Sequence, residues 1–163
     1  MATTITAGNA TNGLAFSADN AGILELKTGT GAGTTAVTIN ASQNLLVVAP
    51  SALGYGTGAG GTVTQLTSKA TAVTLNKPTG QITMSNAALS AGIGVVFTLN
   101  NSLIGTADIV VANIAGGATD TSNYRLEVTT ASGLSKFKIL NNSAGSLSEA
   151  LIINFAIIKG ATS

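Results

Sequence analysis

Leu-Ile-Ile-Asn-Phe-Ala-Ile-Ile, the sequence of residues 151–158, decides the fold. Isoleucine and phenylalanine are enriched in β-strands, and successive residues of a strand point to opposite faces of its sheet. Every position here except Asn154 is apolar, so both faces of this strand need to be covered. One face would pack inside the domain, and two alternatives could cover the other. The cover is either a neighbouring chain or the N-terminal arm of the same chain, lying over a central strand. Both alternatives stay open at this point.

The stretch at residues 124–129 predicts a strand of another kind. Tyr, Leu and Val alternate there with Arg, Glu and Thr, which indicates one buried face and one face in water. Short alternating runs of Thr, Val and Ile recur along the chain, and Gly and Asn separate them. Between residue 62 and the C-terminus we expect eight strands, at residues 62–67, 72–76, 81–85, 93–99, 108–114, 124–130, 134–140 and 151–158.

Eight short strands in about 100 residues are typical of an antiparallel β-sandwich or a jelly-roll-like domain. We therefore predict an all-β protein whose residues 62–163 form this C-terminal domain. Lys77-Pro78-Thr79-Gly80 predicts a turn, and Gly116-Gly117 and Ser132-Gly133 predict two more.

The first third of the chain predicts a smaller unit. Its expected strands are short and contain few apolar residues, so residues 1–49 would form an N-terminal β-rich arm or small subdomain. Residues 50–61 begin with Pro and are rich in Gly, which indicates a linker. The strands expected in the first third lie at residues 3–6, 14–17, 22–27, 36–40 and 44–49.

The composition excludes several classes of partner. Charged residues make up 8% of the chain, and the net charge is +1 with its basic residues scattered, so nothing in the sequence would neutralise a run of phosphates. No uninterrupted apolar run reaches the length of a membrane span. We therefore expect no nucleic-acid partner and no membrane. A surface with few charged residues is poorly protected against self-association. This favours a protein whose surface is covered by other chains in its assembly.

The sequence offers no catalytic group of the usual kinds. It contains no His and no Cys, which removes Ser-His and Cys-His catalysis and the thiolate and imidazole metal ligands. Residues 56–61 match G-x-G-x-x-G, but a β-like stretch follows where a nucleotide site needs a helix. Ser135 and Lys138 match S-x-x-K, but strand alternation places them on opposite faces. We predict no enzyme activity, no cofactor, and no catalytic or metal site.

The chain begins Met-Ala-Thr-Thr-Ile-Thr-Ala-Gly, without a basic segment followed by an apolar one. A secretory signal peptide would have both. We therefore expect the protein to be made in a cytoplasm.

Several stretches of the C-terminal two thirds resemble a known kind of protein. Residues 53–65, Leu-Gly-Tyr-Gly-Thr-Gly-Ala-Gly-Gly-Thr-Val-Thr-Gln, and residues 77–84, Lys-Pro-Thr-Gly-Gln-Ile-Thr-Met, look like a β-domain of structural proteins of tailed bacteriophages. Residues 146–150 and 154–160 at the end of the chain are similar to it as well. The resemblance implies a trimeric virion protein of the capsid-decoration or fibre kind.

We expect a capsid cement or decoration protein first. Its partners would be further copies of itself, as a homotrimer, and the major capsid protein or another virion protein, and its arms would bridge neighbouring capsid subunits. A short fibre that recognises a host surface is the alternative. A carbohydrate-binding module or hidden glycosidase is disfavoured by the absence of Trp. The residues expected at the assembly interface are Ile152, Asn154, Ala156, Ile158 and Tyr55.

Overall fold

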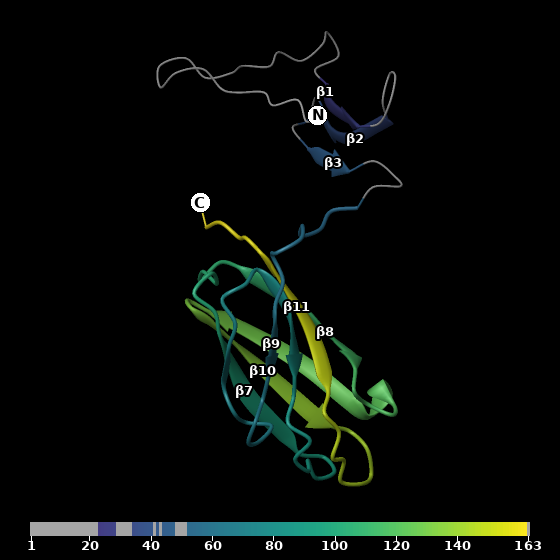
Figure 1. Ribbon diagram of the computed structural model, residues 1–163, viewed down its shortest axis with the longest axis vertical. Helices are drawn as coiled ribbons and strands as arrows, with labels where there is room; N and C mark the ends of the chain where they lie inside the picture. Colours follow the sequence, from purple (N-terminus) through teal and green to yellow (C-terminus); the bar gives the residue numbers. More distant parts are fainter. Residues whose placement is uncertain (1–22, 29–33, 41, 43, 48–51, 163) are drawn as a thin grey trace. The chain divides into compact units, whose positions relative to one another are not determined.

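The computed structural model describes residues 23–28, 34–40, 42, 44–47 and 52–162 (Figure 1). The chain divides into two compact units, Met1–Gly54 and Tyr55–Ser163. The described residues are nearly all strand, loop or turn, and their one helical element is a single 3-10 turn at Thr121–Asn123. The prediction of an all-β protein is confirmed.

The first unit contains a three-stranded antiparallel sheet. Its strands are β1 (Leu24–Thr28), β2 (Thr34–Ile39) and β3 (Leu45–Val47), in the order β1-β2-β3. They confirm the strands predicted near residues 22–27, 36–40 and 44–49, whereas those predicted at residues 3–6 and 14–17 lie outside the described residues. The residues at 23–27, 35–40, 42, 44–47 and 52–54 are all half-buried or exposed.

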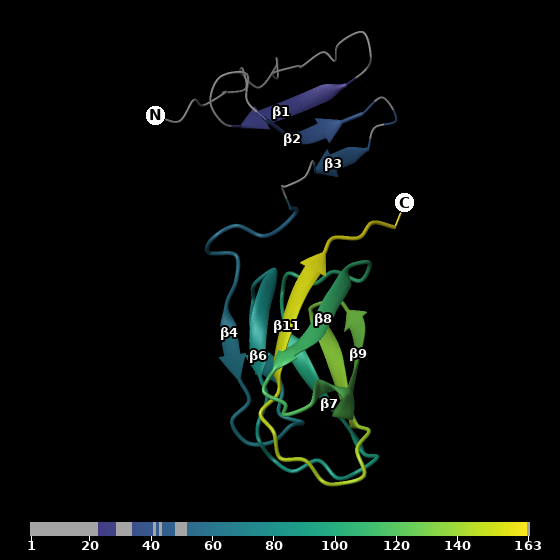
Figure 2. The ribbon, with the colours of Figure 1, turned by 90° about the vertical axis from the view of Figure 1, so that its right-hand side faces the viewer.

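The second unit contains eight strands in two four-stranded sheets, which face each other across a core (Figure 2). All eight were predicted from the sequence, with ends that differ by at most three residues. They are β4 (Thr62–Thr64), β5 (Val73–Thr74), β6 (Thr79–Thr83), β7 (Gly94–Asn100), β8 (Ile109–Gly116), β9 (Tyr124–Ala131), β10 (Leu134–Asn141) and β11 (Ile152–Ile158).

The strand order is β5-β7-β10-β9 in one sheet and β4-β6-β11-β8 in the other. Strands β4 to β7 alternate between the two sheets, so β4 comes to lie beside β6, and β5 beside β7. Both of these pairings are parallel. An antiparallel sandwich was expected, and these two edge pairings depart from it because they are parallel; the jelly-roll topology is not confirmed.

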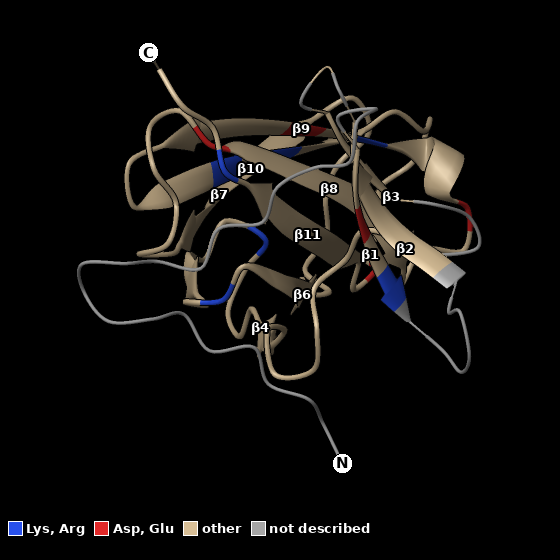
Figure 3. Cartoon of the chain, turned by 90° about the horizontal axis from the view of Figure 1, so that it is seen from above, with Lys and Arg blue, Asp and Glu red and all other residues tan. Residues whose placement is uncertain are grey.

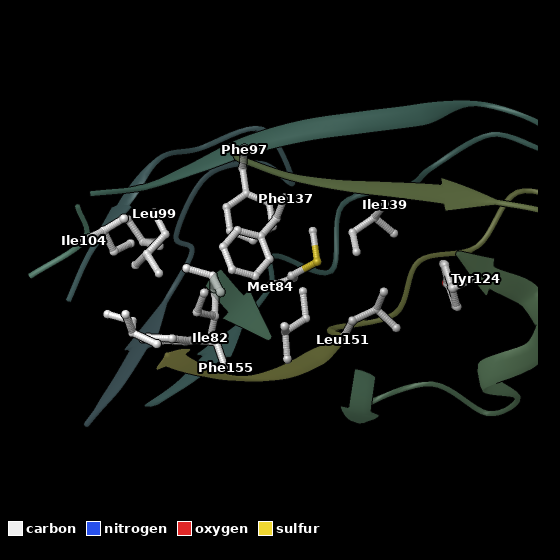
Figure 4. Close-up of a cluster of buried hydrophobic side chains, with 14 of the residues drawn as sticks. Ile82, Met84, Phe97, Leu99, Ile104, Tyr124, Phe137, Ile139, Leu151 and Phe155 are labelled. Carbon is white, nitrogen blue, oxygen red and sulfur yellow. The ribbon is translucent and has the colours of Figure 1, made fainter. Parts of the chain in front are cut away.

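The core between the sheets is built from alternate residues of the long strands. Phe97 of β7 and Phe137 of β10 are directly paired across the ladder, and their rings stack with centroids 5.2 Å apart (Figure 4). Ile153, Phe155 and Ile157 of β11 reach the core from the opposite sheet. One face of the doubly apolar last strand is thus buried inside its own domain.

Two glycine-containing turns close the domain as predicted. Ser132-Gly133 joins β9 to β10, and Gly133 has a φ of 75°, which favours glycine. Gly117, after β8, has a φ of 79° and lies against the backbone of Ala150. The turn predicted at residues 77–80 is shorter than expected, because Thr79 and Gly80 already belong to β6.

A buried polar cluster replaces part of the core at one end of β6. The Lys69 ammonium donates to the carbonyl oxygens of Ser85, at 2.6 Å, and Glu149. The Gln65 amide donates to the carbonyl of Thr71 at 2.7 Å and accepts from the backbone N–H of Ser85. Burial lowers the pKa of Lys69, and the charge of Glu149 acts against that shift. Throughout the described residues, no buried side-chain nitrogen or oxygen is left without a hydrogen bond.

Candidate assembly surface

The outer face of the β4-β6-β11-β8 sheet carries no charged side chain. None of its four strands contains Lys, Arg, Asp or Glu at any position. Figure 3 shows these strands in tan along their whole length. The inward positions of the same strands fill the core, so the outward positions form a sheet surface that this domain leaves open to solvent.

Aliphatic side chains gather where β8 begins and β11 ends. Ile109 and Ile158 are direct cross-strand neighbours, and Val111 follows on the same face opposite Ala156. Ile109 is 59% exposed, Val111 51% and Ile158 54%. Single exposed aliphatic residues are common on monomers, but adjacent ones on an uncharged sheet face form a candidate interaction surface.

A row of uncharged polar residues crosses the sheet next to this cluster. Thr62, Gln81, Asn154 and Asn113 are paired in turn from β4 through β6 and β11 to β8. The Gln81 amide nitrogen donates to the Asn154 side-chain oxygen at 3.0 Å. The row ends with Asn113 at the outer edge strand of the sheet. Amide groups both donate and accept hydrogen bonds, so this row can pair with another polar surface without carrying charge.

The outer face of the β5-β7-β10-β9 sheet is different. Arg125 and Glu127 of β9 point outward there with Lys136 and Lys138 of β10. Glu127 forms ion pairs with Arg125 and with Lys138, the latter at 3.3 Å. These positive neighbours lower the pKa of Glu127. The domain therefore has one charged and one uncharged broad face.

The structure gathers four of the five predicted interface residues on the uncharged face. Asn154 and Ile158 are exposed there, and Ile152 and Ala156 are half-buried. Tyr55 lies elsewhere: its hydroxyl donates to the carbonyl of Ile157. It lines a depression of about 230 Å³ with Pro78, Leu103, Ile157 and Lys159.

The walls of this depression are mainly aliphatic and aromatic, and its one charged group is already paired. The Lys159 ammonium donates to Asp108 and to the carbonyl of Leu103. Asp108 also accepts the backbone N–H groups of Gly105, at 2.7 Å, and Gly160, at 3.0 Å. These donors stabilise the carboxylate and lower the pKa of Asp108 to about 2. The arrangement ties the end of β11 to the start of β8, and it leaves no free acid or base in the depression.

The carboxylate of Glu149 is also held by hydrogen bonds inside the fold. Glu149 accepts hydrogen bonds from the backbone of Thr119 at 2.7 Å and from the Tyr124 hydroxyl at 2.8 Å, and they lower the pKa of Glu149. Burial and this carboxylate together raise the pKa of Tyr124. Both groups connect loops to the start of β9, which is a structural task.

The two sequence motifs take the geometry expected of them. Ser135 and Phe137 are fully buried while Lys136 and Lys138 are exposed, so the S-x-x-K pair is split between two faces of β10. Residues 56–61 lead into strand β4, with no helix after them. The described residues contain no cluster of acidic side chains able to hold a metal ion. No helix among them is long and apolar enough to cross a membrane.

Sequence reasoning missed the contribution of β8. Ile109, Val111 and Asn113 extend the uncharged face by a whole strand. The odd-numbered positions of residues 109–115, Ile, Val, Asn and Ala, carry the signal, because they share a face and contain no charge. Their place beside β11 could not be read from the sequence.

Comparison of the chain with protein-family models, with curated protein sequences and with solved structures finds no match.

Proposed function

We propose that this chain is a non-enzymatic structural protein of a tailed-bacteriophage particle. It acts as a homotrimeric cement protein that bridges neighbouring subunits of the major capsid protein and so stabilises the head. The observation that carries the proposal is the uncharged outer face of the β4-β6-β11-β8 sheet, with Ile109, Val111 and Ile158 about half exposed on it. The resemblance of residues 53–65 and 77–84 to phage structural proteins supports the choice of particle.

Burial of the aliphatic cluster supplies a useful attachment energy. Complete burial of an exposed Val or Ile side chain contributes about 1.5–3 kcal/mol, so covering the exposed half of three such residues contributes roughly 3 kcal/mol per copy. This amount is small for one copy. A capsid repeats it at many equivalent contacts, and each copy of a trimer helps to hold the other two. Because the face is uncharged, the attachment depends little on salt.

The absence of His and Cys from the whole sequence supports a role without catalysis. The carboxylates Asp108 and Glu149 add to this support, since each accepts hydrogen bonds from groups inside the fold at both of its oxygens. A mechanical role needs only a rigid domain with a surface to be covered.

A short fibre or appendage that recognises a host surface is the second candidate. The small three-stranded sheet β1-β2-β3 would then anchor the chain, and the β-sandwich would form the tip. Copy number separates the two candidates. A cement protein approaches the abundance of the shell protein in purified particles, and a fibre is far scarcer.

The experiment compares two exposed valines on opposite faces of the same domain. Val111 is 51% exposed on the uncharged face, and Val96 is 48% exposed on the charged face. Particles that lack the protein are incubated with the wild type, with Val111→Lys or with Val96→Lys. Bound protein is then counted against shell protein, and head rupture on heating is measured.

We expect Val111→Lys to bind at least about tenfold more weakly, which corresponds to about 1.4 kcal/mol, because a charge enters the apolar contact. Val96→Lys binds as the wild type does. Equal binding by both variants would refute the use of this face, and wild-type protein that never associates with particles would refute the virion role. Light scattering that finds a 15.9 kDa monomer at micromolar concentration would refute the trimer.

A further inference from the structure

The two sheets of the sandwich end in four edge strands, and three of them are protected against pairing with another chain. Strand β4 has three residues and β5 has two, which are too short to offer a template. Strand β9 is long, but Arg125 and Glu127 place charges along it. Short length and charge are the usual means by which natural proteins block an edge.

Strand β8 has none of these protections over most of its length. It runs for eight residues, Ile-Val-Val-Ala-Asn-Ile-Ala-Gly, and contains neither a charge nor a proline. Its one irregularity is a register shift opposite Ile152 and Ile153, near its C-terminal end. An uncharged edge strand of this length is a template for a further strand.

The orientation of the backbone shows which groups of β8 are free to pair. The N–H of Ile157 donates to the carbonyl of Pro78, on the β6 side of β11. Backbone direction alternates along a strand, so Asn154, Ala156 and Ile158 bond toward β8. Their partners there are Asn113, Val111 and Ile109. Val110, Ala112 and Ile114 therefore direct their N–H and C=O groups to the open edge.

We propose that β8 pairs antiparallel with β8 of a second copy of this chain, across a two-fold axis at Asn113. Ala112 of each copy lies opposite Ile114 of the other, and these residues exchange backbone hydrogen bonds. The two β4-β6-β11-β8 sheets become one sheet of eight strands. Its uncharged outer face continues from one copy to the next.

The occupant is a second copy because the edge is complementary to itself. Two identical strands that pair across a two-fold axis bring the residue at the axis opposite its own twin, so a charge there would meet like charge, and β8 has none. Asn113 ends the row Thr62-Gln81-Asn154-Asn113, and its amide can both donate to and accept from an identical amide. With the axis at Asn113, the polar row of one copy continues into that of the other. On either side of the axis, aliphatic residues of one copy then lie opposite aliphatic residues of the other.

This contact goes beyond the proposed function and does not depend on it. It uses the edge of β8, whereas capsid attachment uses the outer face of the sheet. In an assembly of trimers it would join one trimer to the next.

The absence of cysteine from the chain makes the contact directly testable with Asn113→Cys. Twin residues on the axis form a non-hydrogen-bonded pair with Cα atoms about 4.5 Å apart, which is within the range of a disulfide. Val111→Cys is the matched control. Its side chain is exposed on the same strand and face, but its twin lies four residues further along, about 13 Å away. The full-length variants are oxidised mildly at low micromolar concentration, and the linked dimer is followed over time on non-reducing gels.

We expect Asn113→Cys to form linked dimer on the order of tenfold faster than Val111→Cys. Equal rates would overturn the proposal, and faster linkage of Val111→Cys would overturn the register. Asn113→Lys puts two ammonium groups opposite each other, and we expect it to abolish this association in light scattering with an unchanged melting temperature. Pairing of copies that persists in Asn113→Lys, as dimers or as pairs of trimers, would likewise overturn the proposal. Binding of the wild-type protein to particles is measured separately, so either idea can fail while the other stands.

Discussion

Truncation of the ring at the centre of the core, Phe137→Ala, is the sharpest test of the two-sheet packing. Phe137 is fully buried on the central strand β10, and its ring stacks on Phe97 at an interplanar angle of 15°. Replacing a buried Phe by Ala costs about 3–5 kcal/mol, because apolar burial is lost and a cavity remains. The position lies in the middle of a sheet, where the backbone cannot collapse into the space, so we expect about 4 kcal/mol.

That loss is large for a domain of this size. Small domains are stable by about 5–15 kcal/mol, so the variant would remain folded with a melting temperature roughly 15 °C lower. Urea unfolding, followed by circular dichroism, gives the change in the free energy of unfolding, and an unchanged dependence on urea shows that the folded state is the same. Val96→Ala, on the exposed side of β7, serves as the control and should cost less than about 0.5 kcal/mol.

Paired conservative variants isolate the ring stacking. In a double-mutant cycle of Phe97→Leu and Phe137→Leu we expect a coupling of about 0.5–1.5 kcal/mol. A cost below about 1 kcal/mol for Phe137→Ala, with the same dependence on urea, would refute the packing described for this core.

Two further predictions concern the loops at the ends of the strands. The pKa of Asp108 is lowered to about 2 in the folded protein, whereas it is near 4 in the unfolded chain. The ionised carboxylate therefore stabilises the fold above about pH 4, and this contribution is lost as the pH falls from about 4 to 2. Asp108→Asn should therefore lower the melting temperature at neutral pH and flatten its fall between those pH values, and an unchanged acid profile would contradict the assignment. Gly117 and Gly133 both have positive φ, but a Cβ on Gly117 would lie 2.0 Å from the Ala150 carbonyl oxygen, whereas one on Gly133 meets nothing within 4 Å. Gly133→Ala should cost about 1–2 kcal/mol from backbone strain alone, and Gly117→Ala clearly more in the same urea titration, whereas equal costs would contradict the close approach.

Local pattern predicted the strands of the second unit well. Alternation identified β9 with Tyr124 turned inward and Arg125 outward, and it divided Ser135 from Lys136 in β10. Side chains of a strand alternate whatever its neighbours are, so a few adjacent residues contain this information. The turn at Ser132-Gly133 was visible for the same local reason.

Strand pairing was beyond the reach of the same reasoning. The parallel edges formed by β4 and β5 depend on which sheet each strand joins, and their partners β6 and β7 lie further along the chain. Gly80 was assigned to a turn although it belongs to a strand, where a Cβ would lie 2.6 Å from Leu75 and 2.8 Å from the carbonyl oxygen of Gly61. Such a close approach exists only once the sheet has formed.

The candidate surface, too, could be predicted from the sequence only in part. By itself, the sequence determined that residues 151–158 form a strand with two apolar faces, and that the chain lacks imidazole and thiol. Only the tertiary structure decided that Ile153, Phe155 and Ile157 face the core, that Ile109, Val111 and Asn113 lie beside the outward positions of β11, and that β8 ends the sheet. The physical reason is one of range. The pattern of apolar and polar residues is a property of one strand and can be read from adjacent residues. A surface is made by strands brought together from distant parts of the chain.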